Sequence, residues 1–141
     1  MATVAVSGID RPVSLVRNVG SPYSEGITPL IAGSGNVANA SAAATLTPSA
    51  TTTAHISGFE VTGAGSTAAS VVTVTVAGLL GGTRHYTYTF PAGATVACAP
   101  LVVNFNPPLP ASAVNTAIVV TCPAGGTGNT NTTVVAHGFH V

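Results

Sequence analysis

Short runs of residues with a period of two, separated by turns, constrain the fold of this chain more than any other feature. Valine alternates with threonine in residues 71–77, and aromatic residues alternate with His and Thr in residues 84–90. Residues 101–105 repeat the pattern. A period of two with one apolar face is typical of a half-buried antiparallel strand. The alternation predicts that one face of each run points into the core, namely Val72, Val74, Val76, Tyr86, Tyr88, Phe90, Leu101, Val103 and Phe105.

Glycine and proline mark the turns between these runs, because Gly permits positive φ and Pro removes a backbone donor. The predicted turns are residues 63–66, 78–83, 91–93, 106–110 and 123–129. Further strands are expected at residues 37–45, 54–61, 117–121 and 132–141, with the run 37–45 as the first strand of the domain. No stretch has the charge pairs and caps of a helix. The sequence therefore predicts an all-β fold, an antiparallel β-sandwich or a barrel.

Two segments near the ends of the predicted domain resemble each other. Residues 54–61 read Ala-His-Ile-Ser-Gly-Phe-Glu-Val, and residues 136–141 read Ala-His-Gly-Phe-His-Val. Both place a Gly-Phe pair shortly after a histidine. We expect these segments to be neighbouring strands with a bulge at Gly58 and Gly138, because interior strand glycines often mark bulges.

The first 36 residues differ from the rest of the chain. They show little alternation, yet they contain four of the six charged residues, Asp10, Arg11, Arg17 and Glu25. This composition predicts an extended N-terminal arm over residues 1–36 and a β-sandwich over residues 37–141. Two interpretations of the arm stay open, a partner-contact element and a flexible tail.

The scarcity of charge excludes several functions. Charged residues make up 4% of the 141 residues, and lysine is absent. Nucleic-acid binding requires neutralisation of several phosphates at once, and a polybasic membrane switch requires clustered cations, so neither is expected. Apolar runs are far shorter than the roughly 20 residues of a membrane-spanning helix, and the N-terminus does not resemble a secretory signal. We therefore expect a reducing compartment and free thiols at Cys98 and Cys122.

Combinations of residues that are typical of active sites are nearly absent from the sequence. Glu60 is the only carboxylate after residue 25, so paired-carboxylate chemistry is not expected, and no Gly-x-Ser-x-Gly motif occurs. Nothing in the sequence arranges a cysteine with a histidine as a nucleophile. The metal-ligand candidates are His55, His85, His137 and His140. His137 and His140 are three residues apart on a predicted strand and point to opposite faces unless a bulge intervenes. We predict no catalytic residue, metal or cofactor.

What remains is a neutral surface of small residues, which favours a structural protein in an assembly. Several segments carry a family resemblance: Phe59-Glu-Val-Thr-Gly63, residues 69–78, residues 82–93, residues 101–112, residues 115–121 and Ala136-His-Gly-Phe139. Together these strands and turns resemble small virion proteins of tailed bacteriophages, the jelly-roll cement or decoration proteins of the capsid. The likeness covers residues 37–141 and leaves the arm unmatched.

The resemblance implies an eight-stranded jelly roll that binds the major capsid protein on the outer surface of the head and bridges capsomers. It also implies self-assembly into dimers or trimers, of which we expect the homodimer. The protein would be part of the virion after synthesis in the bacterial cytoplasm. We expect Asp10, Arg11, Arg17 and Glu25 to contact the capsid. Two alternatives stay open, a carbohydrate-binding jelly-roll module and a tail or head-fibre component of the virion.

Overall fold

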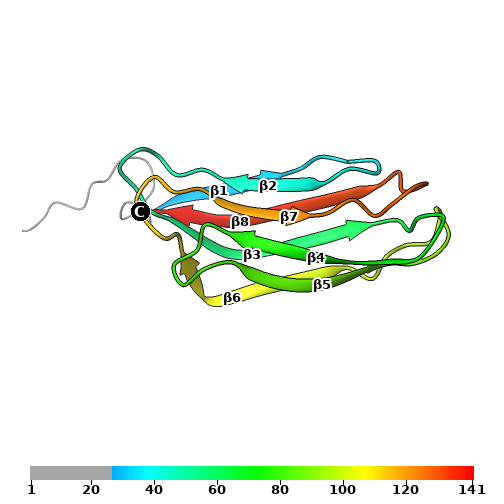
Figure 1. Ribbon diagram of the computed structural model, residues 1–141. Coiled ribbons are helices and arrows are strands. Elements are labelled where there is room, and N and C mark those ends of the chain that lie inside the picture. Colours follow the sequence, from blue (N-terminus) through cyan, green and yellow to red (C-terminus); the bar gives the residue numbers. More distant parts are fainter. Residues whose placement is uncertain (1–26) are drawn as a thin grey trace, which may run out of the picture.

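The computed structural model describes residues 27–141, which form two facing antiparallel sheets (Figure 1). The eight strands are β1 (Thr28–Gly33), β2 (Ala42–Leu46), β3 (Ala54–Gly63), β4 (Ser70–Ala77), β5 (Arg84–Phe90), β6 (Leu101–Pro110), β7 (Ile118–Cys122) and β8 (Thr132–His140). Among residues 27–141, no helix is long and apolar enough to cross a membrane.

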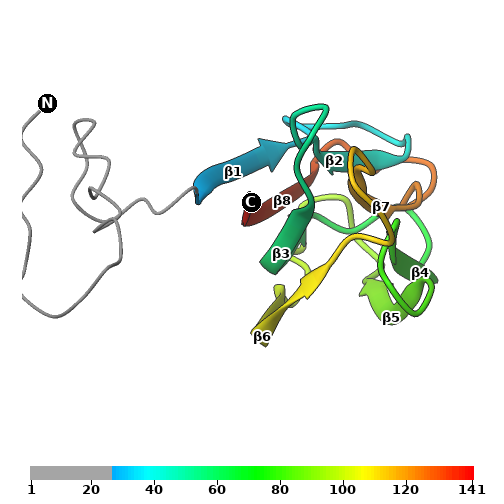
Figure 2. The ribbon, with the colours of Figure 1, turned by 90° about the vertical axis from the view of Figure 1, so that its left-hand side faces the viewer.

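The strand order is that of a jelly roll. Sheet A has the order β1-β8-β3-β6 and sheet B has the order β2-β7-β4-β5. The chain changes sheet at every connection except the β4–β5 hairpin, which is the double Greek-key arrangement of a jelly roll. An end-on view shows the two layers, with β1 and β2 together on one side and β6 and β5 on the other (Figure 2). The all-β sandwich prediction is confirmed.

The sandwich begins earlier in the chain than the sequence pattern indicates. β1 starts at Thr28 and pairs with β8 from Thr28↔His140 to Gly33↔Val135, so the predicted boundary after residue 36 falls beyond the first strand. The run expected at residues 37–45 instead provides β2, the second strand, which begins at Ala42. Pro29 and Gly33 obscured the alternation of β1, because both residues are poor signals for a strand.

The core lies between the sheets and is built from the inner faces of the strands. Its largest fully buried side chains include Phe59, Phe90, Leu46, Ile56 and Ile118. The predicted core positions divide into two groups. Val74, Val76, Tyr88 and Phe90 are buried, whereas Val72, Tyr86, Leu101, Val103 and Phe105 are half-buried and pack against the core. Most of the second group lies on β5 and β6, which are edge strands where the sandwich is less covered.

β6 continues through residues 106–110, where the prolines predicted a turn. The register explains this difference, because it passes from Gly58↔Asn104 directly to Ile56↔Leu109 and leaves residues 105–108 unpaired. Pro107 and Pro108 lie in this interruption, where a missing backbone N–H removes no hydrogen bond from the ladder. Asn106–Pro107 is a cis peptide within this strand.

Candidate interaction surfaces

A β-bulge in β3 shapes the outer face of sheet A. β3 pairs with β8 over its whole length, and the register shifts between Ile56 and Gly58, so that Ser57 is the extra residue. The Ser57 hydroxyl donates a hydrogen bond to the carbonyl oxygen of His137 at 3.1 Å. The structure confirms the predicted pairing of the two similar segments and the bulge next to Gly58. The bulge predicted at Gly138 is wrong, because Gly138 pairs regularly with Ile56 and Leu30. Because of the bulge at Ser57, His55 and Glu60 lie on the same outward face although they are an odd number of residues apart.

We call the solvent side of sheet A the β3–β8 face. It exposes large aliphatic side chains, with Ile31 on β1 80% exposed and Val102 on β6 59% exposed. Glu60 lies between Val135 and Val102 in the register. At one end of the face the rings of His55 and Phe139 stack at 5.0 Å with an interplanar angle of 5°. This face therefore combines apolar area, an aromatic pair and a single carboxylate.

Gly58 lies at the centre of this face and has no room for a side chain. A Cβ at this position would lie 2.9 Å from both the Asn104 Oδ1 and the His137 Nε2. The two polar side chains thus cover the glycine from neighbouring strands. Neither Asn104 nor Ile31 stood out in the sequence, because their place on this face follows from strand register and not from any motif.

The outer face of sheet B has a different chemistry. It consists largely of threonines on adjacent strands, with Thr73 opposite Thr87 and Thr75 opposite Thr121. Val71 is its one large exposed aliphatic side chain among the described residues, at 68% exposure. We call this surface the threonine face. Hydroxyl groups are well solvated by water, so burying this face against a partner brings less free energy than burying the β3–β8 face.

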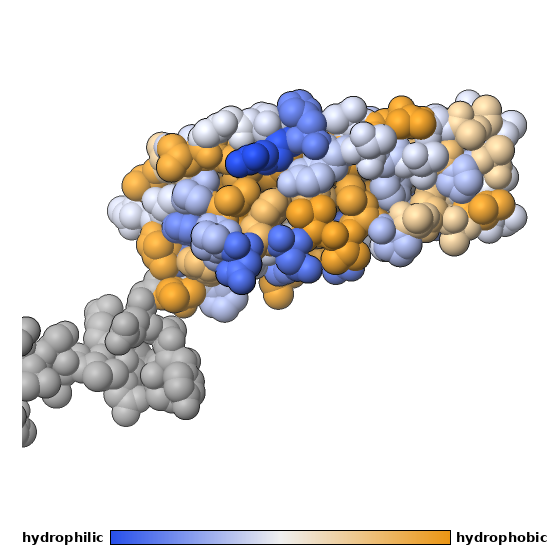
Figure 3. Space-filling model, turned by 90° about the horizontal axis from the view of Figure 1, so that it is seen from below, coloured by the Kyte–Doolittle hydropathy of each residue, from blue (hydrophilic) through white to orange (hydrophobic). Residues whose placement is uncertain are grey.

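The open side of the sandwich lies between β5 and β6. Viewed from below, apolar side chains form a stripe there between more hydrophilic borders (Figure 3). The half-buried hydrophobic residues of these two strands, which pack against the core, are Tyr86, Leu101, Val103, Phe105 and Leu109. β5 itself pairs only with β4 and leaves its other edge unpaired.

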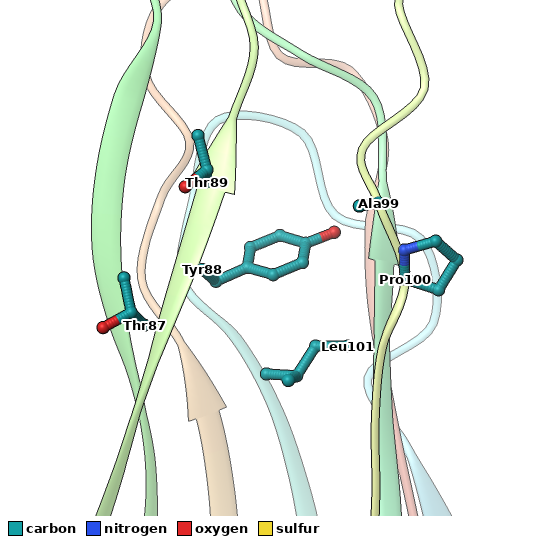
Figure 4. Close-up of a pocket in the computed structure, with 6 residues that line it drawn as sticks. All are labelled: Thr87, Tyr88, Thr89, Ala99, Pro100 and Leu101. Atoms are coloured by element: carbon teal, nitrogen blue, oxygen red, sulfur yellow. The ribbon is translucent and has the colours of Figure 1, made fainter.

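A shallow pocket of about 240 Å³ lies beside this stripe, between Thr87–Thr89 and Ala99–Leu101. The Tyr88 ring extends from β5 across this pocket toward Ala99 and Pro100 (Figure 4). Its hydroxyl is buried and has no hydrogen-bond partner. Burial, and secondarily the neighbouring Cys98, raises the pKa of Tyr88 well above its usual range, so the phenol is neutral at physiological pH.

Both cysteines are free, as the sequence predicted, and the structure buries both of them. Burial, with a smaller contribution from Cys98, raises the pKa of the Cys122 thiol to about 11. A thiol in this state is neutral near pH 7, and the thiolate is the nucleophilic form. Cys122 is therefore a packing residue.

The histidines take separate structural positions. His137 points outward on the β3–β8 face, whereas the His140 Nδ1 accepts a hydrogen bond from the Ser49 backbone N–H at 3.3 Å and lies 2.5 Å from the Thr52 Oγ1. Hydrogen bonding of His140 thus links the end of β8 to the connection between β2 and β3. His85 is exposed on β5. Within residues 27–141, no three side chains of His, Cys, Asp or Glu are placed to hold a metal ion.

The four residues predicted to contact the capsid, Asp10, Arg11, Arg17 and Glu25, lie outside the described residues. The comparisons with known proteins match this chain to no family model, no curated protein and no solved structure. The candidate interaction surfaces are therefore inferred only from the structure and sequence of this chain.

Proposed function

We propose that this protein is a capsid cement protein that binds the outer surface of a phage head and bridges neighbouring capsomers. The jelly-roll topology, the near absence of charge and the apolar β3–β8 face support the proposal. The β3–β8 face is the observation that matters most, because exposed aliphatic side chains on a sheet favour burial against another protein. The chemistry of the described residues supports binding and offers no arrangement for catalysis.

The proposed mechanism is stabilisation by selective binding. A protein that binds the assembled shell and not its separated subunits stabilises the shell by RT ln(1+[L]/Kd) per site. This term is about 2.7 kcal/mol at a hundredfold excess over Kd. Contacts that span two capsomers add this free energy at each junction and so oppose the pressure of packaged DNA.

Within this proposal, the β3–β8 face meets the shell and the threonine face remains in solvent. β1 lies within residues 1–36, the range predicted as the arm, and it is also the edge strand with the most exposed aliphatic residue, Ile31. Contacts from Arg11 and Arg17 would therefore extend the same interface from its edge. Charged side chains in these contacts would set orientation, while the apolar face would supply most of the affinity.

Co-sedimentation of the purified protein with shells that lack it tests the proposal. We expect saturable binding at a fixed ratio to the major capsid protein and a raised temperature of shell disruption. Ile31→Lys should weaken binding at least tenfold, because it places a charge in the apolar interface. Val71→Lys is the matched control, since Val71 is similarly exposed on the threonine face and its change should leave binding unaltered. Absence of binding, or equal loss in both variants, would contradict the proposal.

A carbohydrate-binding module is the second candidate, and one observation favours it. The stacked pair of His55 and Phe139 provides an aromatic surface near the polar groups of His137 and Asn104. Aromatic faces combined with a few polar groups are a common arrangement in sites for small ligands. A glycan array probed with the wild-type protein and with Phe139→Ala separates the two candidates. Glycan binding lost in Phe139→Ala would favour the second.

A further inference from the structure

β5 is an edge strand in which residues 85–90 contain no proline, charge or bulge that would block pairing with another strand. It is seven residues long, contains no proline and has β4 as its only neighbour in sheet B. The edge strand of sheet A next to it, β6, contains Pro107, Pro108 and Pro110. Edge strands are usually protected by proline, charge or bulges, and an unprotected regular edge is a template for strand addition. The contrast between the two edges indicates that the unpaired backbone edge of β5 is available to a partner strand.

The sequence of β5 is complementary to itself in the antiparallel direction. A two-fold axis at Thr87, the middle residue of the strand, places Thr87 opposite the second copy's Thr87 and Tyr86 opposite the second copy's Tyr88. Cross-strand pairs of aromatic residues and of threonines are both stabilising. Tyr86 is half-buried, so part of its ring is free to contact another chain.

Charge also fits this arrangement. Arg84 is the only charged residue of β5, and the two-fold axis places it opposite the second copy's Phe90, with the two arginines at opposite ends of the joint strand pair. Like charges therefore do not face each other. Exposed aliphatic residues flank both ends of the strand, Leu80 before Arg84 at 67% exposure and Val96 after Phe90 at 45% exposure. Antiparallel pairing brings these two ends together across the axis.

We propose that the protein forms a homodimer through β5, in which the two B sheets join edge to edge into one continuous eight-stranded sheet, twice the four strands of each copy. The interface consists of the β5 backbone edges, the exposed part of the Tyr86 ring, and the apolar stripe next to it. This symmetry is isologous, as in most homodimers. The dimer leaves both β3–β8 faces free, so it is independent of the proposed function and concerns a different surface.

Sedimentation velocity of the full chain over a wide range of concentration tests the dimer. The wild type should show a monomer–dimer equilibrium. Thr87→Lys should shift that equilibrium at least tenfold toward monomer, because it places two lysines directly opposite each other across the axis. Thr73→Lys is the matched control, since Thr73 is the exposed register partner of Thr87 on β4, away from the edge. It should leave the equilibrium unchanged. Thermal unfolding of both variants establishes that they fold.

Cross-linking provides a second, positive test. Cα atoms of directly opposed antiparallel residues lie about 4.5–5.5 Å apart, which is within the range that a disulfide spans. Thr87→Cys should therefore form a covalent dimer under mild oxidation, whereas Thr73→Cys should not. A wild-type monomer at every concentration, a dimer unaffected by Thr87→Lys, or no Thr87→Cys cross-link would overturn the inference. These measurements use no shells, so their failure is separate from a failure of the proposed function.

Discussion

Burial of Cys122 links the stability of the fold to alkaline pH. The raised pKa of about 11, from 9.0, means that the folded protein holds the thiol proton more tightly than the unfolded chain does. Its contribution to stability is complete below pH 9 and is lost as the pH rises through 11. The free energy of unfolding should fall by roughly 2 to 3 kcal/mol as the pH rises from 9 to beyond 11, which is the free-energy equivalent of this pKa shift.

Urea unfolding at several pH values measures this effect. Tyr88→Phe provides the background, because the raised pKa of Tyr88 acts in the same direction at high pH. In that background, Cys122→Ala should lower stability at neutral pH but remove most of the decline between pH 9 and 11. An unchanged decline in the Cys122→Ala variant would show that the thiol does not cause it.

At the scale of elements, the β3 and β8 backbones approach each other so closely at Gly138 that no side chain fits there. A Cβ at Gly138 would overlap the carbonyl oxygen of His55 on the neighbouring strand. Gly138→Ala should therefore destabilise the protein by about 2–3 kcal/mol, the usual cost of forcing extra atoms into a packed site. Denaturant unfolding measures the change.

Gly33 on β1 provides the matched control for that variant. The nearest atom to a Cβ at Gly33 is 3.8 Å away, which is ordinary van der Waals contact, and Gly33 lies in the same sheet. Gly33→Ala should change stability by less than about 1 kcal/mol, and stabilisation is the expected sign because alanine restricts the unfolded chain. Equal destabilisation in both variants would mean that the β3–β8 strands adjust to an added side chain.

The elements also show what alternation in the sequence does and does not reveal. β5 was predicted with its observed bounds, Arg84–Phe90, because its alternation is unbroken and turns flank it. β1 was missed because Pro29 and Gly33 interrupt its pattern at the edge of sheet A. The predicted β6 ended early because its prolines fall where its register with β3 is interrupted, at residues 105–108. Whether a run is an edge depends on the strand order, which periodicity does not encode.

The candidate surfaces were harder to predict for a related reason. His55 and Glu60 share a face only because Ser57 is an extra residue in the ladder, and a strict period of two places them on opposite faces. Ile31 and Val102 lie at the two opposite edges of the β3–β8 face, and long-range register with β8 and β3 places both of them on it. Pairing between distant strands, and not local composition, therefore creates the surface on which the proposed function depends.

At the scale of the whole molecule, the low charge predicts an unusual response to salt. Glu60 and Arg84 are the only charged residues after residue 25, so a shell interface on the β3–β8 face depends mainly on apolar burial. Sodium chloride screens charges but weakens apolar contacts little, whereas sulfate strengthens them. Binding to shells should thus change by less than about threefold from low to high sodium chloride, and it should tighten in sodium sulfate of equal ionic strength.

Co-sedimentation in the two salts measures this response, and the Arg11→Ala, Arg17→Ala double variant identifies its charged part. If the arm contacts the shell through these arginines, the double variant should bind more weakly at low salt and lose the remaining dependence on sodium chloride. The response to sulfate should persist, because the apolar face is unchanged. A steep loss of wild-type binding in sodium chloride would instead show that charged groups of the arm dominate the interface, which would remove the main role assigned to the β3–β8 face.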